Sequence, residues 1–85
     1  MAISAQTKTR NMIYTVVAEM FDTDVQNLDE TSSPDTIERW DSMGHIQLIG
    51  ALEQEFDMVF TPDEQSEMLN ISLIIEIIES RIIKT

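Results

Sequence analysis

Cysteine is absent from the 85-residue chain, and this excludes disulfide bonds, thiolate metal ligands and a cysteine nucleophile. With a single histidine as well, the chain has too few ligands for a zinc site, so we expect no bound metal. No apolar run approaches the roughly 20 residues of a membrane-spanning helix, and residues 1–10 lack the apolar core of a secretory signal. We therefore expect a cytoplasmic protein that does not cross a membrane.

Positive charge is also scarce: five Lys and Arg residues stand against 16 Asp and Glu residues, which gives a formal net charge of −11. Repulsion from phosphate groups argues against nucleic acid and against an anionic membrane surface as partners. An acidic domain of this kind suits partners with basic docking patches, because charge steering raises association rates. The plainer alternative, that the acidity only keeps the protein soluble, stays open at this stage.

The distribution of apolar residues predicts four helices in a single domain that spans residues 1–85. Each longer helix carries an apolar stripe at helical spacing, whereas the segment between the first two helices shows no sustained period and indicates a long loop. The predicted fold is therefore an all-α, monomeric four-helix bundle with three longer helices and one short helix. The longer helices are expected at residues 4–21, 42–56 and 72–84, and the loop at residues 21–41.

The short helix is predicted from its first turn. Thr61 and Glu64 have the spacing of a capping box, in which each side chain bonds the backbone N–H of the other residue. Pro62 suits the first helical position, where no N–H donor is needed. Asn70 interrupts the apolar pattern that follows, so this helix must end before it.

The helix expected at residues 42–56 carries two separate groups of apolar residues. A helix in a small bundle needs only one apolar stripe, so the second group predicts a surface that a partner contacts. The alternative is that the second group packs as ordinary core beneath the long loop. Gly50, within the second group, allows another backbone to approach that face closely. The first group is Leu48, Ile49, Leu52 and Phe56, with His45 among them, and the second is Met43, Ile46 and Gly50.

The start of this helix carries a serine that we expect to be exposed. Asp41 or Ser42 is a good N-cap, because a short side-chain oxygen accepts hydrogen bonds from the free N–H groups of the first turn. Those groups and the helix dipole favour an anion such as a phosphate. The stretch Trp40-Asp41-Ser42-Met43 resembles the attachment site of the acyl and peptidyl carrier proteins, whose hallmark is Asp-Ser-Leu followed by an apolar-patterned helix. The resemblance covers nearly the whole chain and continues through Leu48, Leu52, Glu53, Glu55 and Phe56.

The resemblance implies that a phosphopantetheinyl transferase links 4′-phosphopantetheine to Ser42 through a phosphodiester, with Asp41 recognised as part of the motif. It further implies a carrier and not an enzyme. Acyl or related groups would travel as thioesters on the arm to acyl-loading, acyl-transfer or synthase enzymes of fatty-acid, polyketide or other specialised biosynthesis. A peptidyl or aminoacyl carrier is the alternative within the family.

Partner recognition is expected on the surface beside Ser42. Gly44 and Gln47 stand where fatty-acid carriers usually bear acidic residues, so the sequence favours a carrier of a specialised pathway. The space between the last three helices offers partial shelter to an attached acyl chain, although two of its lining residues suit the core equally well. The expected recognition residues are Met43, Ile46, Gln47, Glu53 and Glu55, and the expected lining residues are Ile46, Met68 and Ile71.

Two interpretations belong to other functional classes. A carrier-like bundle can act as an interaction module that binds a partner through Met43 and Ile46 without any cofactor. A small serine hydrolase would need His45, one turn from Ser42, as the base that activates the hydroxyl. No glycine-rich nucleophile elbow and no obvious orienting acid accompany this pair, and we expect His45 to project toward the core. No catalytic residue is therefore assigned.

Overall fold

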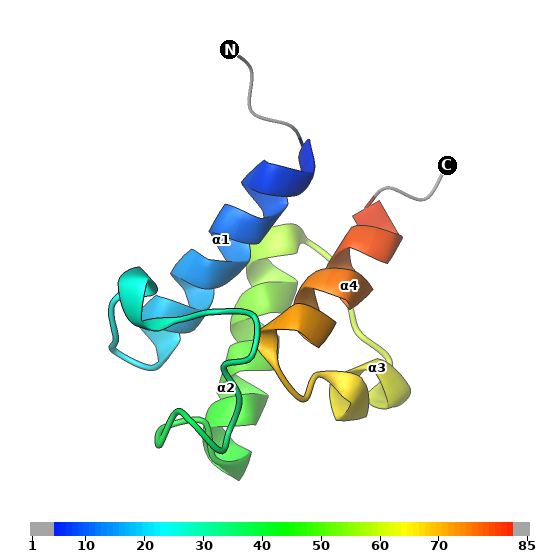
Figure 1. The fold of residues 1–85 in the computed structure, drawn as a ribbon. Helices are drawn as coiled ribbons and strands as arrows, with labels where there is room; N and C mark the ends of the chain where they lie inside the picture. The colour runs from blue at the N-terminus through cyan, green and yellow to red at the C-terminus, as the bar shows by residue number, and fades with distance from the viewer. Residues whose placement is uncertain (1–4, 83–85) are drawn as a thin grey trace.

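The structure, a computed structural model, describes residues 5–82. In that range the chain forms four α-helices and one 3-10 helix and contains no strand, which confirms the expected all-α bundle (Figure 1). Residue 4 and residues 83–84, at the ends of two expected helices, lie outside the described residues. The elements are α1 (Ala5–Met20), η1 (Val25–Asn27), α2 (Ser42–Phe56), α3 (Pro62–Glu67) and α4 (Ile71–Ile82).

The three longer helices form the body of the bundle. In Figure 1, α1 runs downward from its first residue, whereas α2 and α4 run upward, and α1 packs against both of them. An ion pair between Arg10 and Glu79, 3.4 Å from Nε to Oε2, joins the early part of α1 to the late part of α4. None of the helices in the described part of the chain is long and apolar enough to span a bilayer.

The core lies between these helices and takes one apolar stripe from each, as their sequence periodicity predicts. Trp40 and Phe60, which belong to no helix, are also fully enclosed in the core. The apolar core residues of the described chain are Ile13, Val16, Val17, Ala18, Phe21, Leu28, Trp40, Leu48, Ile49, Leu52, Phe60, Met68, Ile71, Ile74, Ile75 and Ile78.

The long loop between α1 and α2 is tied to the start of α4. The carbonyl of Ser32 accepts from the N–H of Ile71 at 3.1 Å, and the carbonyl of Glu30 accepts from the N–H of Ser72 at 3.0 Å. The Asn70 side chain caps the same first turn. The first N–H groups of a helix have no partner within it, so the loop supplies partners that the helix lacks. The loop is thereby held across the bundle toward α2.

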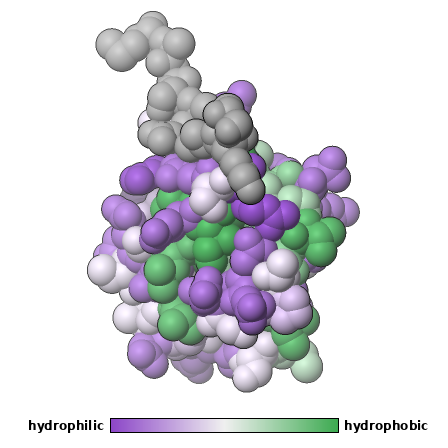
Figure 2. All heavy atoms as spheres, turned by 90° about the vertical axis from the view of Figure 1, so that its right-hand side faces the viewer, coloured by the Kyte–Doolittle hydropathy of each residue, from purple (hydrophilic) through white to green (hydrophobic). Residues whose placement is uncertain are grey.

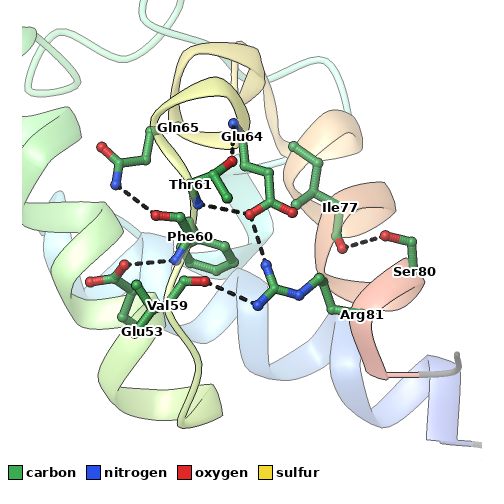
Figure 3. A network of polar contacts seen from close by, with 9 residues as sticks. All are labelled: Glu53, Val59, Phe60, Thr61, Glu64, Gln65, Ile77, Ser80 and Arg81. Carbon is green, nitrogen blue, oxygen red and sulfur yellow. Dashed lines mark hydrogen bonds and ion pairs between the residues drawn. The ribbon is translucent and has the colours of Figure 1, made fainter.

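The short helix α3 is held against α4 by a polar network (Figure 3). The expected capping box is present: the Thr61 hydroxyl accepts from the Glu64 N–H at 3.1 Å, and the Thr61 N–H donates to Glu64 Oε1 at 2.9 Å. Arg81 of α4 donates to the same Oε1 at 2.7 Å and to the Val59 carbonyl at 3.0 Å. The backbone bond from Thr61, with a further contribution from Arg81, holds the pKa of Glu64 below its ordinary value, against the opposing effect of burial.

Candidate functional site

Ser42 is the first residue of α2 and is exposed to solvent. Of the two candidate caps, the structure selects Asp41, whose Oδ1 accepts from the Gly44 N–H at 2.8 Å. The Asp41 carbonyl accepts the first helical hydrogen bond, from the His45 N–H at 2.8 Å, so Ser42 is the first residue of the helix. None of the hydrogen bonds in the described part of the chain involves the Ser42 hydroxyl. This oxygen is therefore exposed at the start of a regular helix.

Gly44 lets the loop pass close over the first turn of α2. A Cβ atom at this position would lie 2.2 Å from the carbonyl oxygen of Arg39 and 3.1 Å from Cε1 of Phe21. Only a residue without a side chain fits such a gap. At Gly50, where we expected room for another backbone to approach, a Cβ atom would meet no atom within 4 Å, so this face of α2 is open. Within this chain the glycine that positions a neighbouring backbone is Gly44.

A relay of rings beside Ser42 joins the loop to α2 and α3. The indole Nε1–H of Trp40 donates to Nδ1 of His45 at 2.9 Å, so Nδ1 carries no proton. Nε2 then carries the proton and donates to the Gln65 carbonyl, 3.0 Å away. The Trp40 ring also stacks on His45 at 6.3 Å and on Phe21 at 5.5 Å between centroids. The relay thus connects four segments of the chain at one end of the bundle.

The bonds of His45 bear on whether Ser42 is activated. A serine nucleophile needs a base with a free ring nitrogen directed at its hydroxyl. Both nitrogens of His45 are occupied, one by Trp40 and one by Gln65. His45 is half-buried, near the edge of the core as its place on the helix predicts. In this arrangement neither ring nitrogen is bonded to the serine, and the histidine joins α2 to the long loop and to α3.

A groove of about 880 Å³ opens beside Ser42, between the long loop, α2, α3 and the segment after α3. Ile49 and the fully buried side chains of Trp40 and Met68 form its deeper part. Ile46 and Leu69, which are 70% and 61% exposed, stand at its edges. The groove is therefore largely apolar and open to solvent along the side that carries the serine. Its charged lining residues are Glu38 and Asp41.

The structure places the three expected lining residues differently. Ile46 and Met68 both line the groove, the first at its rim and the second in its depth. Ile71 is fully buried in the core and is not among the residues that line this groove, which corrects its expected position. The reason is that Ile71 opens α4 on its core-facing side, where the loop carbonyl of Ser32 covers its backbone.

The second apolar group of α2 is exposed and does not pack beneath the loop. Met43 and Ile46 are 69% and 70% exposed, so the core alternative for these two side chains is wrong. Gln47, one turn from Met43, is exposed as well. Together these residues form an apolar surface with a polar edge directly after Ser42, which is the composition of many partner surfaces.

The two acidic residues expected to recognise partners have different environments. Glu55 is exposed near the end of α2. Glu53 is half-buried, and its Oε2 accepts from the Phe60 N–H at 2.9 Å, while Gln65 donates to the Phe60 carbonyl at 3.1 Å (Figure 3). Glu53 therefore helps to fix the connector between α2 and α3. No cluster of three or more His, Asp or Glu side chains suited to a metal ion occurs within residues 5–82.

Comparison of the chain with models of known protein families gives no match, and comparison with curated proteins gives none either. A functional assignment therefore depends on the residues and geometry of the site itself.

Three contributors to the site were not identified from the sequence. Trp40 was noted only as part of the motif, although an isolated tryptophan in a polar loop five residues before the single histidine is a signal of burial. Gln65 contributes through its carbonyl, which no side-chain pattern reveals. Leu69 lies after the short helix and reaches the groove edge because the chain turns there toward α4.

Proposed function

We propose that this chain is an acyl carrier protein, with 4′-phosphopantetheine attached to Ser42 and acyl or related groups carried on it as thioesters. The single observation that carries the proposal is the placement of the Ser42 hydroxyl. It is exposed, makes no hydrogen bond to the described residues, and stands at the start of a 15-residue helix beside an apolar groove. A tether point needs an accessible oxygen on a rigid element and does not need a reactive one.

The residues around Ser42 suit a phosphodiester. The negative charge would lie at the N-terminus of α2, where unpaired N–H groups and the helix dipole favour an anion. On attachment, the Ser42 oxygen would bond the pantetheine-bearing phosphorus of the diphosphate in coenzyme A. The bond from that phosphorus to the bridging oxygen would break, adenosine 3′,5′-bisphosphate would leave with that oxygen, and the hydroxyl proton would pass to a base of the transferase. The group supplies a thiol on a flexible arm, which a chain without cysteine lacks.

The surface after Ser42 supports recognition by partner enzymes. Met43 and Ile46 offer apolar contacts, and Gln47 and Glu55 lie further along the exposed side of α2. The net charge of −11 favours transferases and acyl-transfer enzymes that carry basic docking patches. The groove beside the serine gives an attached group partial shelter, with Ile46 and Met68 among its lining residues.

Intact mass spectrometry after incubation with a promiscuous phosphopantetheinyl transferase and coenzyme A tests the proposal. We expect the wild-type chain to gain the mass of one phosphopantetheine group and Ser42→Ala to gain none. Ser66→Ala is the matched control, because Ser66 is also exposed and lines the same groove. It should be modified like the wild type. An unchanged mass for the folded wild-type chain, or modification of Ser42→Ala, would refute the proposal.

A second candidate is an interaction module that uses the same surface without a cofactor, and the exposure of Met43 and Ile46 is the observation in its favour. It predicts no mass gain, together with partner binding that Ser42→Ala retains and Met43→Ala weakens. A peptidyl or aminoacyl carrier would be modified in the same way as an acyl carrier. The two are separated by which class of thioester forms when loading enzymes are supplied.

A further inference from the structure

A second apolar hollow lies on the outer side of α3 and α4. It has a volume of about 380 Å³ and shares only Leu69 with the groove at Ser42. Figure 2 views the molecule from the side of Figure 1 on which α3 and α4 lie, and apolar side chains reach the surface there between polar ones. We call this feature the α4 hollow, and it is lined by Glu67, Leu69, Leu73, Glu76, Ile77 and Ser80.

The apolar residues of the α4 hollow form a row. Leu73 and Ile77 are four positions apart on α4 and so stand one turn apart on the same side of the helix. Leu69, which is 61% exposed, continues the row before α4 begins. Leu73 and Ile77 are only half-buried, whereas Ile74 and Ile78, about 100° further round the helix, are fully enclosed. A contiguous apolar row at helical spacing suits a groove for the side chains of another helix.

The charges at the rim of the α4 hollow decide which partner fits. Glu67 and Glu76 are both exposed, and neither carboxylate makes an ion pair or hydrogen bond within the described residues. The nearby Arg81 is already bonded to Glu64 and to the Val59 carbonyl. A second copy of this chain would bring like charges together, since each copy carries a net charge of −11. A partner with basic residues beside its apolar row meets the opposite charge.

We infer that the α4 hollow binds an amphipathic helix of a partner protein that carries Lys or Arg on both sides of an apolar stripe. The site lies on the partly exposed flank of α4, and Ser42 is not among its lining residues. The chain can thus be held by one partner through α4 while the serine is presented to another. The inference does not depend on modification of Ser42.

The test uses two synthetic helical peptides of equal length with the same leucine stripe, one flanked by lysines and the other by glutamates. Each is titrated into the full-length, ¹⁵N-labelled chain while the backbone amide signals are followed by NMR. We expect the lysine peptide to shift the signals of residues 69–80 and the glutamate peptide to leave them in place. Raising the salt concentration should weaken the binding, because rim charges are screened.

Variants place the binding on the named residues. Glu76→Lys is expected to lower the affinity for the lysine peptide about fivefold, because it replaces an attractive charge at the rim by a repulsive one. Leu73→Ser should lower the affinity for the same peptide about tenfold, because apolar contact is lost. Val25→Ser, an exposed apolar residue elsewhere, and Ser42→Ala are matched controls that should bind like the wild type. Glu76→Lys changes only an exposed side chain, so it remains informative if Leu73→Ser fails to fold.

Several results would overturn the inference. These are equal binding of both peptides, signal shifts confined to the groove around Trp40 and Ile46, and unchanged affinity in both variants of the hollow. Sedimentation showing a dimer that Glu76→Lys strengthens would assign the hollow to a second copy of the chain. If the wild-type chain gains no mass with the transferase and coenzyme A but still binds the lysine peptide, the carrier proposal fails and this inference stands.

Discussion

The two glycines of α2 should respond in opposite directions to the same substitution. At Gly44 an added Cβ atom would lie 2.2 Å from the Arg39 carbonyl oxygen, closer than such atoms approach without a shift of the backbone. At Gly50 no atom lies within 4 Å of the added carbon. Both positions are helical, so both substitutions bring the same gain in helix propensity. The difference between them therefore isolates the contact with the loop.

The magnitudes follow from the two terms. Replacing a helical glycine by alanine stabilises by about 1 kcal/mol where space is available. Overpacking costs about 1–3 kcal/mol, and the upper end applies to Gly44 because the obstructing atom belongs to the backbone. We expect Gly50→Ala to gain about 1 kcal/mol and Gly44→Ala to lose about 2 kcal/mol. For a domain of this size, each kcal/mol shifts the Tm by about 4–8 °C.

Urea denaturation followed by circular dichroism and by tryptophan fluorescence measures both effects. Trp40 is the single tryptophan, is fully buried and adjoins Arg39, so its fluorescence also reports movement of the loop. Gly44→Ala should alter the native-state fluorescence, and Gly50→Ala should not. Equal stability changes in the two variants, or a stable Gly44→Ala with unchanged fluorescence, would show that the loop does not pass over the helix as described.

Three further predictions concern the core, the ring relay and the capping network. Leu52→Ala, which opens a cavity in the core, should lower the free energy of unfolding by about 2–5 kcal/mol. Met43→Ala should change it by less than about 0.5 kcal/mol. Equal losses in urea denaturation would show that Met43 is a core residue. ¹⁵N NMR of the His45 ring should show a neutral imidazole with its proton on Nε2, and a proton on Nδ1 would contradict the bond from Trp40. Because the folded-state pKa of Glu64 is lowered, its contribution to stability is present above the unfolded pKa and is lost as the pH falls through the folded pKa. Glu64→Gln should therefore flatten the fall of unfolding free energy on acidification, and parallel pH profiles for the two proteins would refute this.

The predictions that depend on short stretches of sequence were the most accurate. The range 42–56 was predicted for the second helix and is the range observed. The capping box at Thr61 and Glu64 is present with both of its bonds. Caps and apolar periodicity act over a few residues, so their physical basis is contained in the local sequence. The exposure of Met43 and Ile46 followed from the same geometry, since both lie off the core-facing stripe.

Contacts between segments far apart in the chain could not be predicted from the local sequence. Ile71 was expected in the groove and lies in the core, because the long loop covers the start of α4. The close approach of the loop to Gly44 was not predicted, because it depends on the loop returning over the first turn of α2. Neither the path of a loop without regular structure nor its carbonyl positions leave a periodic signal in the sequence.

By itself, the sequence determined the helices, their caps and the placement of Ser42 at a helix N-terminus, because backbone hydrogen bonding and apolar periodicity are local properties. Only the tertiary structure decided how that terminus is framed. The stacking of Trp40 on His45, the bond from His45 to Gln65 and the groove beside Ser42 each join segments far apart in the chain. Such contacts arise when burial of the apolar stripes brings those segments together, and this packing determines which side chains remain exposed around the serine.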